Sequence, residues 1–226
     1  TGGRPGVDRE NPDLRINAQI YGGKLNVSID LSGESLHRRG YRTQAGAAPL
    51  KENLAAGLLL RAGWGTEGSF KQLVDPMCGS GTFLVEAAMI SLNMAPGLRR
   101  TYWGFKGWQQ HDHRMWQRLN DEAKNSKKSF DEVGITFIGT DSEQRAIAAS
   151  RENIKRAGLT GLIDVSMSPF QNHEFNLTQA PGLVITNPPY GERIGEEMAL
   201  MSLYRQLGEW VVTHCNGWRF YMLTSM

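Results

Sequence analysis

The chain has few cysteines and no long apolar run. Cys78 and Cys215 are the only two cysteines among 226 residues, so the sequence offers no disulfide framework and suits a reducing compartment. No apolar stretch approaches the roughly 20 residues that a membrane-spanning helix needs, and the chain does not start with a signal-peptide pattern. We therefore expect a cytoplasmic protein with no membrane partner.

The sequence also lacks a strong net charge, because its formal charge of +2 indicates no partner by itself. Residues 97–128 are different: they hold eight Lys/Arg against three Asp/Glu, together with Trp103, Trp108 and Trp116. Basic residues interleaved with aromatic rings suit single-stranded nucleic acid, because each base stacked on a ring contributes about 1–3 kcal/mol. The alternative is a solvated helix whose rings pack on the protein. A single tryptophan favours packing, whereas the whole cluster favours nucleic acid.

The order of the expected elements predicts the fold class. With 40% hydrophobic residues, the chain can bury one sizeable core. Apolar strand-like runs alternate with helix-like runs, which predicts a Rossmann-like α/β fold with a parallel sheet and right-handed crossovers. The expected strands are 71–75, 135–140, 162–167, 182–187 and 218–224, and the expected helices are 47–62, 82–93, 143–157 and 198–213. Residues 94–134 are too long for a plain connection and predict a basic, aromatic insertion with helical content at 109–124.

The N-terminal region predicts a β-hairpin. Residues 14–31 alternate apolar and polar side chains around Gly22-Gly23, which is typical of two strands joined by a two-residue turn. An isolated hairpin is marginal in water, so this one either packs on the chain or is the remnant of another domain. A basic linker follows, in which Arg38, Arg39 and Arg42 either contact phosphates or solvate the segment. We favour phosphate contact.

Two short motifs carry the chemistry. In Asp75-Pro-Met-Cys-Gly-Ser-Gly-Thr82, a strand turns into a helix, and glycines at 79 and 81 permit a sharp turn and a close approach to a ligand. Asn187-Pro-Pro-Tyr190 follows another apolar strand, at the end where open α/β sheets bind ligands. A glycine loop alone is weak evidence of function, whereas both motifs in this order, each after a strand, are strong evidence.

The order and residues of these motifs resemble the amino-methylating class of S-adenosylmethionine-dependent methyltransferases. The resemblance implies that the glycine-rich loop wraps the cofactor's amino-acid tail and sulfonium, and that Asp75 meets its ammonium. Asp141, at the end of the second strand, would accept the ribose hydroxyls, with a helix cap as its alternative role. Asn187 Oδ1 and the Pro188 carbonyl would each accept one N–H of the target amine, while Tyr190 would stack on the flipped base. The implied cofactor-binding set is Asp75, Pro76, Cys78, Gly79, Gly81, Thr82, Asp141, Ser142, Ser168 and Phe170, and the implied catalytic set is Asn187, Pro188, Pro189 and Tyr190.

Three features depart from this pattern or compete with it. Related enzymes often carry an acid just after the third strand to bind adenine, where this chain has Met167-Ser168-Pro169-Phe170. Phe170 could pack on adenine, whereas this chain has no acid at that place to accept a hydrogen bond from the adenine amine. Cys78 could be a nucleophile, yet a glycine-rich loop requires a small residue at this position, and amine methylation needs no covalent step. His111 and His113 have no further cysteine or histidine at a spacing typical of metal ligands, so we predict no metal site.

More of the chain is similar to bacterial 23S rRNA guanine-N2 methyltransferases, which carry a THUMP RNA-binding domain ahead of the catalytic domain. The similar segments are 31–42, 48–56, 95–98 and 187–193. The resemblance implies that residues 1–36 end a THUMP domain, that 37–226 form the methyltransferase domain, and that the partner is 23S rRNA in the large-subunit precursor. Such sheets normally have seven strands, so we expect a domain truncated after about its fifth strand. The alternatives are DNA adenine-N6 methylation, which uses the same four residues, and a non-catalytic RNA-binding fragment.

Overall fold

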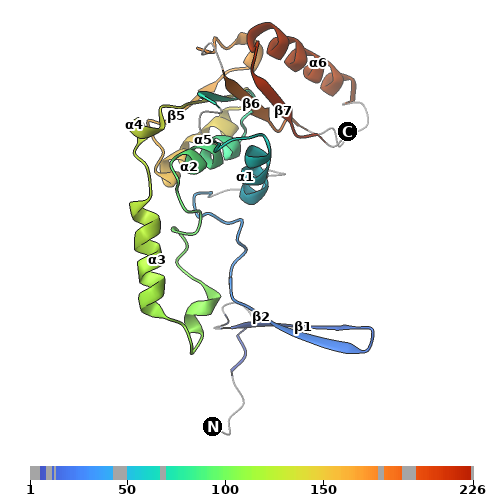
Figure 1. Ribbon diagram of the computed structural model, residues 1–226. Helices are drawn as coiled ribbons and strands as arrows, with labels where there is room; N and C mark the ends of the chain where they lie inside the picture. Colours follow the sequence, from blue (N-terminus) through green and yellow to red (C-terminus); the bar gives the residue numbers. More distant parts are fainter. Residues whose placement is uncertain are drawn as a thin grey trace.

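The computed structural model describes residues 6–8, 12, 14–42, 50–66, 70–177, 181–189 and 197–224 (Figure 1). Tyr190 therefore lies outside the described residues, as do residues 47–49 of the helix expected at 47–62, which begins at Glu52. Within the described part of the chain, no helix is both long enough and apolar enough to cross a membrane.

A five-stranded sheet forms the centre of the molecule, and all its neighbouring strands are parallel. Its spatial order is β5-β4-β3-β6-β7, which confirms the predicted Rossmann-like α/β fold. From β3 the chain first builds β4 and β5 on one side, and it later places β6 and β7 on the other. The topological switch point, where such sheets bind ligands, therefore lies between β3 and β6. The strands are β3 (Gln72–Asp75), β4 (Thr136–Asp141), β5 (Ile163–Met167), β6 (Gly182–Thr186) and β7 (Arg219–Met222).

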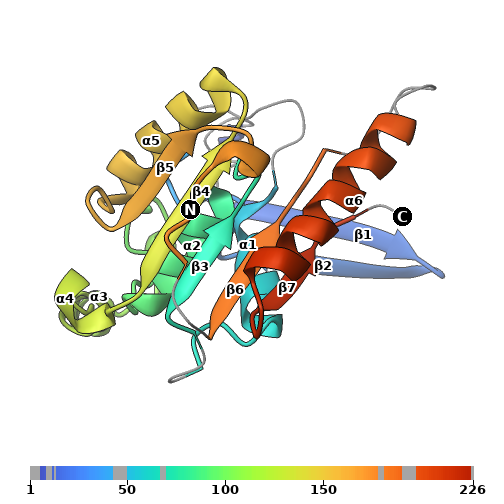
Figure 2. The ribbon, with the colours of Figure 1, turned by 90° about the horizontal axis from the view of Figure 1, so that it is seen from above.

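Helices cover both faces of this sheet (Figure 2). Side chains alternate between the faces along a strand, so Leu73 packs with one layer of helices and Val74 with the other. The first layer is larger and holds most of the core. It consists of α1 (Glu52–Arg61), α2 (Thr82–Ser91) and α5 (Gln144–Ala157), while α6 (Glu197–His214) covers the opposite face.

The predicted hairpin is present and extends away from the sheet (Figure 1). It consists of β1 (Arg15–Tyr21) and β2 (Lys24–Asp30). Gly22 and Gly23 have φ angles of 57° and 71°, as a two-residue turn with positive φ at both positions requires. Large apolar side chains on both strands are exposed, with Ile20 at 80%.

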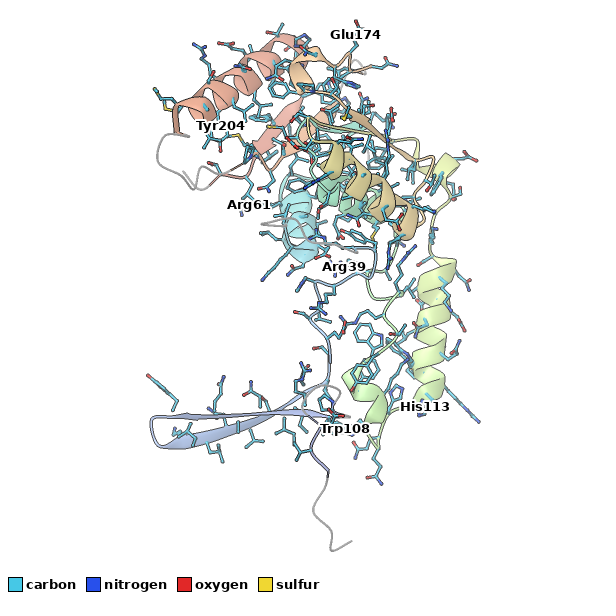
Figure 3. The ribbon with its side chains drawn as sticks, turned by 180° about the vertical axis from the view of Figure 1, so that it is seen from behind. Arg39, Arg61, Trp108, His113, Glu174 and Tyr204 are labelled. Atoms are coloured by element: carbon cyan, nitrogen blue, oxygen red, sulfur yellow. The ribbon has the colours of Figure 1, made fainter. Side chains whose placement is uncertain are left out.

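Residues 94–134 form the predicted insertion, although its main helix begins at His113 instead of 109. It contains η1 (Gly104–Gly107), α3 (His113–Asn125) and α4 (Phe130–Val133). The rings of Trp103, Phe105 and Trp116 lie 4.9–5.6 Å apart, centroid to centroid. These rings therefore pack on one another, two of the three pairs edge-on, and the structure favours this packing over base stacking for them. Trp108 is 39% exposed (Figure 3).

The insertion also anchors the end of the hairpin. The Phe105 amide donates a hydrogen bond of 3.0 Å to the Leu31 carbonyl. The Arg100 guanidinium donates to the carbonyls of Ser32 and Glu34, at 3.0 and 2.7 Å. These contacts join the base of the hairpin to the segment around η1, and the hairpin extends away from the sheet (Figure 1).

Candidate active site

The two sequence motifs leave the sheet from neighbouring strands. β3 and β6 pair in parallel, with Val74 opposite Val184. Asp75 therefore ends β3 and Asn187 directly follows β6, at the carboxyl ends of adjacent strands and at the switch point of the sheet. The glycine-rich loop and the Asn-Pro-Pro motif therefore leave the same end of the sheet from neighbouring strands.

Both glycines of the loop 75–82 are required by its backbone. Gly79 and Gly81 have φ angles of 53° and 75°, in the left-handed region that favours glycine. The Gly81 amide donates to the Cys78 carbonyl at 2.8 Å and closes a tight turn. A Cβ on Gly81 would lie 2.4 Å from Ser150 Oγ of α5, so only glycine fits between the loop and that helix.

Asp141 joins the second strand to this loop. Its Oδ2 accepts a hydrogen bond of 2.9 Å from the Gly79 amide, and its Oδ1 accepts one of 2.9 Å from the Glu143 amide. The residue at the N-cap of α5 is Glu143, so Asp141 supports the turn before the helix and is not the cap itself. Each carboxylate oxygen has a further lone pair, so Asp141 can still accept a hydroxyl from a ligand. Ser142 beside it is exposed.

Asp75 is a buried acid at the base of the site, with 2% exposure. Loss of water raises the pKa of its carboxyl to about 7, and the nearby Asp141 carboxylate adds to this effect. The Met77 amide donates to Asp75 Oδ1 at 3.3 Å and acts in the opposite direction. A buried carboxyl with a shifted pKa at a ligand-binding edge marks a candidate functional group that a bound cation would ionise.

Three other residues of the loop, Pro76, Cys78 and Thr82, have structural roles. Burial raises the pKa of the Cys78 thiol well above its usual range, which favours its packing role over that of a nucleophile. The Pro76 carbonyl accepts a hydrogen bond of 3.0 Å from the Thr140 hydroxyl. Thr82 Oγ1 accepts one of 2.7 Å from the Arg42 guanidinium.

The Asn-Pro-Pro motif is held by the opposite layer. Asn187 is half-buried, Pro188 is buried and Pro189 is exposed. The Tyr204 hydroxyl of α6 donates a hydrogen bond of 3.1 Å to the Pro189 carbonyl (Figure 3). This tether was not predicted, because Tyr204 lies far along the chain and carries no local signal of its role.

The structure corrects the interpretation of two linker arginines. Arg39 Nε lies 3.5 Å from Glu86 Oε2, and Arg42 Nε lies 3.7 Å from Glu52 Oε1. Both side chains are only 12% exposed, and Figure 3 shows Arg39 between the hairpin and the helical layer. These guanidinium groups fasten the linker to α2 and α1 instead of facing solvent. Phosphate contact stays a prediction for Arg38 alone, whose side chain is 65% exposed.

After β5, Phe170 does not lie where we expected a ring that packs on adenine. This residue is 2% exposed, and its ring packs edge-on against Trp210 of α6, with centroids 5.9 Å apart. Its face is therefore part of the core and is not open to an adenine ring. Ser168 is half-buried, and its amide donates to the Asp141 carbonyl at 3.0 Å, which keeps it near the proposed ribose position. The short 3-10 helix η2 (Phe170–Asn172), which was not predicted, forms this corner.

The histidine pair of the insertion packs as part of the aromatic cluster. The rings of His111 and His113 lie 4.5 Å apart, and His111 also contacts Phe105 at 5.3 Å. Asp112 caps α3 by accepting a hydrogen bond of 2.9 Å from the Met115 amide. Over the described ranges, no three or more His, Cys, Asp or Glu residues are grouped to hold a metal ion.

A protein family and two of its relatives are similar to most or all of the chain. A family model described as "RMKL-like, methyltransferase domain" matches residues 39–226. The ribosomal RNA large subunit methyltransferase K/L of Marinomonas sp. (strain MWYL1) is 72% identical over all of this chain and 31% of its own length. The protein of the same name from Syntrophotalea carbinolica is 47% identical over 98% of this chain and 32% of its own length. The chain thus spans about a third of these relatives.

Solved structures share the fold. The crystal structure of SMU.472 complexed with S-adenosylhomocysteine (SAH) superimposes with a TM-score of 0.84 and 34% identity, over 95% of this chain and 54% of that one. A predicted N6-adenine-specific DNA methylase from Listeria monocytogenes has a TM-score of 0.80 and 34% identity, over 93% of this chain and 53% of that one.

Proposed function

Because the chain belongs to the RMKL-like methyltransferase domain family, we propose that it transfers a methyl group from S-adenosylmethionine to the N2 amine of a guanine in 23S rRNA. The observation that carries the proposal is the hydrogen bond between Gly79 and Asp141, which joins the glycine-rich loop to the acid of the next strand. This pair lies at the same sheet edge as Asn187-Pro188. Cofactor and acceptor would therefore meet at the switch point.

The residues at this edge fit the polar parts of the cofactor, which supplies a methyl group on a sulfonium. Asp75 provides a buried carboxylate for the cationic ammonium, since a nearby positive charge favours its ionised form. Asp141 has lone pairs left for the ribose hydroxyls. The first turn of α2 presents backbone N–H groups, which attract the carboxylate of the amino-acid tail.

The Asn-Pro-Pro motif fits an amine whose lone pair is delocalised. Asn187 Oδ1 and the Pro188 carbonyl each accept one N–H, which concentrates electron density on nitrogen and orients it. Orientation and fixed dipoles of this kind supply a large share of many rate enhancements. Pro189 has no N–H of its own to compete, and Tyr204 holds its carbonyl. Stacking of Tyr190 on a flipped base stays a proposal that lies outside the described residues.

The proposed partner is 23S rRNA in the large-subunit precursor, and the proposed site of action is the cytoplasm. Residues 1–36 are proposed to end a THUMP RNA-binding domain, and 37–226 to form the methyltransferase domain. Support for this division comes from the hairpin, whose apolar residues Ile20 and Val27 are 80% and 62% exposed, as expected where a further domain would cover them.

An assay of substrate choice tests the proposal. The protein is incubated with labelled S-adenosylmethionine and either rRNA from a strain lacking the gene or adenine-containing duplex DNA, and modified nucleosides are then identified by mass spectrometry. The expected product is N2-methylguanosine in rRNA. If labelled N6-methyladenine forms preferentially in DNA, the proposal is wrong and the chain is a DNA adenine-N6 methyltransferase. If calorimetry detects no binding of S-adenosylmethionine or S-adenosylhomocysteine (SAH) at all, a non-catalytic RNA-binding fragment becomes the better interpretation.

A further inference from the structure

Helix α5 contacts the glycine-rich loop through a buried asparagine. Asn153 is 1% exposed, and its Nδ2 donates a hydrogen bond of 2.9 Å to the Ser80 carbonyl. Ser150, one turn earlier on the same face of α5, is fully buried against Gly81. A polar side chain on a buried helix face costs free energy unless it is paired, so this position needs a reason.

The contact holds one peptide plane at both ends. The peptide between Ser80 and Gly81 donates its N–H to the Cys78 carbonyl at 2.8 Å and accepts the Asn153 hydrogen bond at its C=O. The N–H and C=O of a planar trans peptide point in opposite directions, so these two bonds fix the rotation of the plane. Gly81 is the N-cap of α2, so this plane sets where the first N–H groups of α2 point.

Asn153 satisfies only part of its hydrogen-bonding capacity in doing so. Its Oδ1 is buried and has no hydrogen-bond partner among the described residues. An unpaired buried acceptor destabilises the folded state and offsets what the Nδ2 bond contributes. Stability alone therefore gives a weak reason for an asparagine here, whereas the position of the loop gives a direct one.

We propose that Asn153 is a positioning residue for the cofactor: it orients the Ser80–Gly81 peptide so that the N-terminus of α2 faces the carboxylate of S-adenosylmethionine. This inference rests on the proposed function, because it assumes that the loop 75–82 binds that cofactor. Asn153 acts through the loop and does not touch the reacting atoms.

The test uses Asn153→Asp, which has nearly the same shape as the natural side chain. An ionised carboxylate cannot donate to the Ser80 carbonyl, whereas a protonated one can, and burial raises the pKa of such an acid. The dissociation constant of SAH is measured by calorimetry between about pH 5.5 and 8.5, a range chosen to span the protonation of a buried acid. All measurements are made well below the melting temperature of each variant and expressed as the ratio of variant to wild type. The matched control is Asn125→Asp, which adds the same group at an exposed position of α3.

For Asn153→Asp, the ratio is expected to be roughly tenfold or more at the high end of the range and to approach one at the low end. For Asn125→Asp, it should stay near one throughout. If Asn153→Asp lowers the melting temperature but its ratio stays near one at every pH, Asn153 is merely structural and the inference is overturned. Wild-type protein that binds no SAH would instead overturn the proposed function, and this inference with it.

Discussion

The backbone amide of Gly79 donates a hydrogen bond of 2.9 Å to Oδ2 of Asp141, although the two residues belong to different strand-to-helix units of the chain. This bond places the carboxylate proposed to bind ribose against the loop proposed to hold the rest of the cofactor. A single contact thus links the position of the proposed ribose-binding carboxylate to the conformation of the glycine-rich loop.

Replacing Asp141 is therefore expected to weaken cofactor binding strongly. Asp141→Ala removes the acceptor for two backbone amides and for the ribose, and hydrogen bonds to charged groups contribute about 1.5–3 kcal/mol each. The dissociation constant of SAH should rise by at least about tenfold in calorimetry. Asp164→Ala, at an exposed acid of β5, serves as the control and should leave affinity unchanged. Equal effects of the two variants would contradict the assigned role of Asp141.

The pKa of about 7 at Asp75 predicts proton-linked binding. A bound ammonium favours the ionised carboxylate, so cofactor affinity should rise as pH increases toward 7, with a proton released below that pH. Calorimetry in two buffers of different ionisation enthalpy counts the released protons. Asp75→Asn should abolish this release. A wild-type protein that releases as few protons as this variant at about pH 6, below the shifted pKa, would contradict the prediction.

The same pKa also predicts how the stability of the cofactor-free protein depends on pH. Folding raises the pKa of Asp75 from 3.8 to about 7, so the folded state binds this proton more tightly than the unfolded state. The resulting stabilisation is fully present below pH 3.8 and is lost as pH rises through about 7. In thermal unfolding, the difference in melting temperature between wild type and Asp75→Asn should shift in favour of the variant across this window. A difference that stays constant with pH would contradict the raised pKa.

Asn187→Ala should separate catalysis from cofactor binding. Removing an acceptor that acts on the amine in the transition state is expected to lower kcat by about 10²–10³, as does removing one oxyanion-hole donor. The dissociation constant of SAH should change little. Steady-state assays with rRNA and calorimetry measure the two quantities, with Asn216→Ala, at an exposed turn between α6 and β7, as the control. If kcat falls and the dissociation constant of SAH rises to a similar extent, Asn187 is structural.

Tyr204→Phe tests the tether on the acceptor motif. The hydrogen bond to the Pro189 carbonyl contributes about 0.5–1.5 kcal/mol of stabilisation. If all of it stabilises the transition state, its loss should lower kcat by roughly 2- to 12-fold. Affinity for SAH should be unchanged, because the tether lies on the other motif. The control is Tyr221→Phe on β7, where the side chain is 39% exposed. A kcat for Tyr204→Phe that matches this control would show that the tether does not position the motif.

The two loop glycines should differ in their response to alanine. Gly79→Ala incurs only the cost of a left-handed backbone, about 1–2 kcal/mol, because no atom lies within 4 Å of its new Cβ. Gly81→Ala incurs this cost and also places its Cβ 2.4 Å from Ser150 Oγ. Urea unfolding should show the larger destabilisation for Gly81→Ala. Restoring part of that loss with the double change Gly81→Ala and Ser150→Gly would support the clash, and no recovery would argue against it.

Most of the fold was predictable because its signals are local. The five strands and the helices α2, α5 and α6 appear within a few residues of their predicted bounds, since apolar runs and glycine or proline stops act on their own segment. The helix of the insertion begins later than predicted because Asp112, not an earlier residue, accepts the capping hydrogen bond. The short elements α4 and η2 escaped prediction because a single turn leaves almost no periodic pattern.

The site was predictable in its motifs and less so in its contacts. Asp75, Asp141 and Asn187 could be selected because each lies at the carboxyl end of an apolar strand. Asn153 could have been noticed as a polar residue on the apolar face of α5, but the partner of its side chain could not have been identified. Tyr204 offered no comparable signal.

By itself, the sequence determined the elements, their α/β class and the two loops that carry the chemistry, because backbone propensity and side-chain periodicity depend on neighbours in the chain. The tertiary structure alone decided that β6 lies beside β3, that Arg39 and Arg42 face carboxylates, and that Phe170 belongs to the core. These outcomes depend on how helices rotate and pack against a sheet. That packing brings together side chains from distant parts of the chain, and no local pattern specifies such pairs.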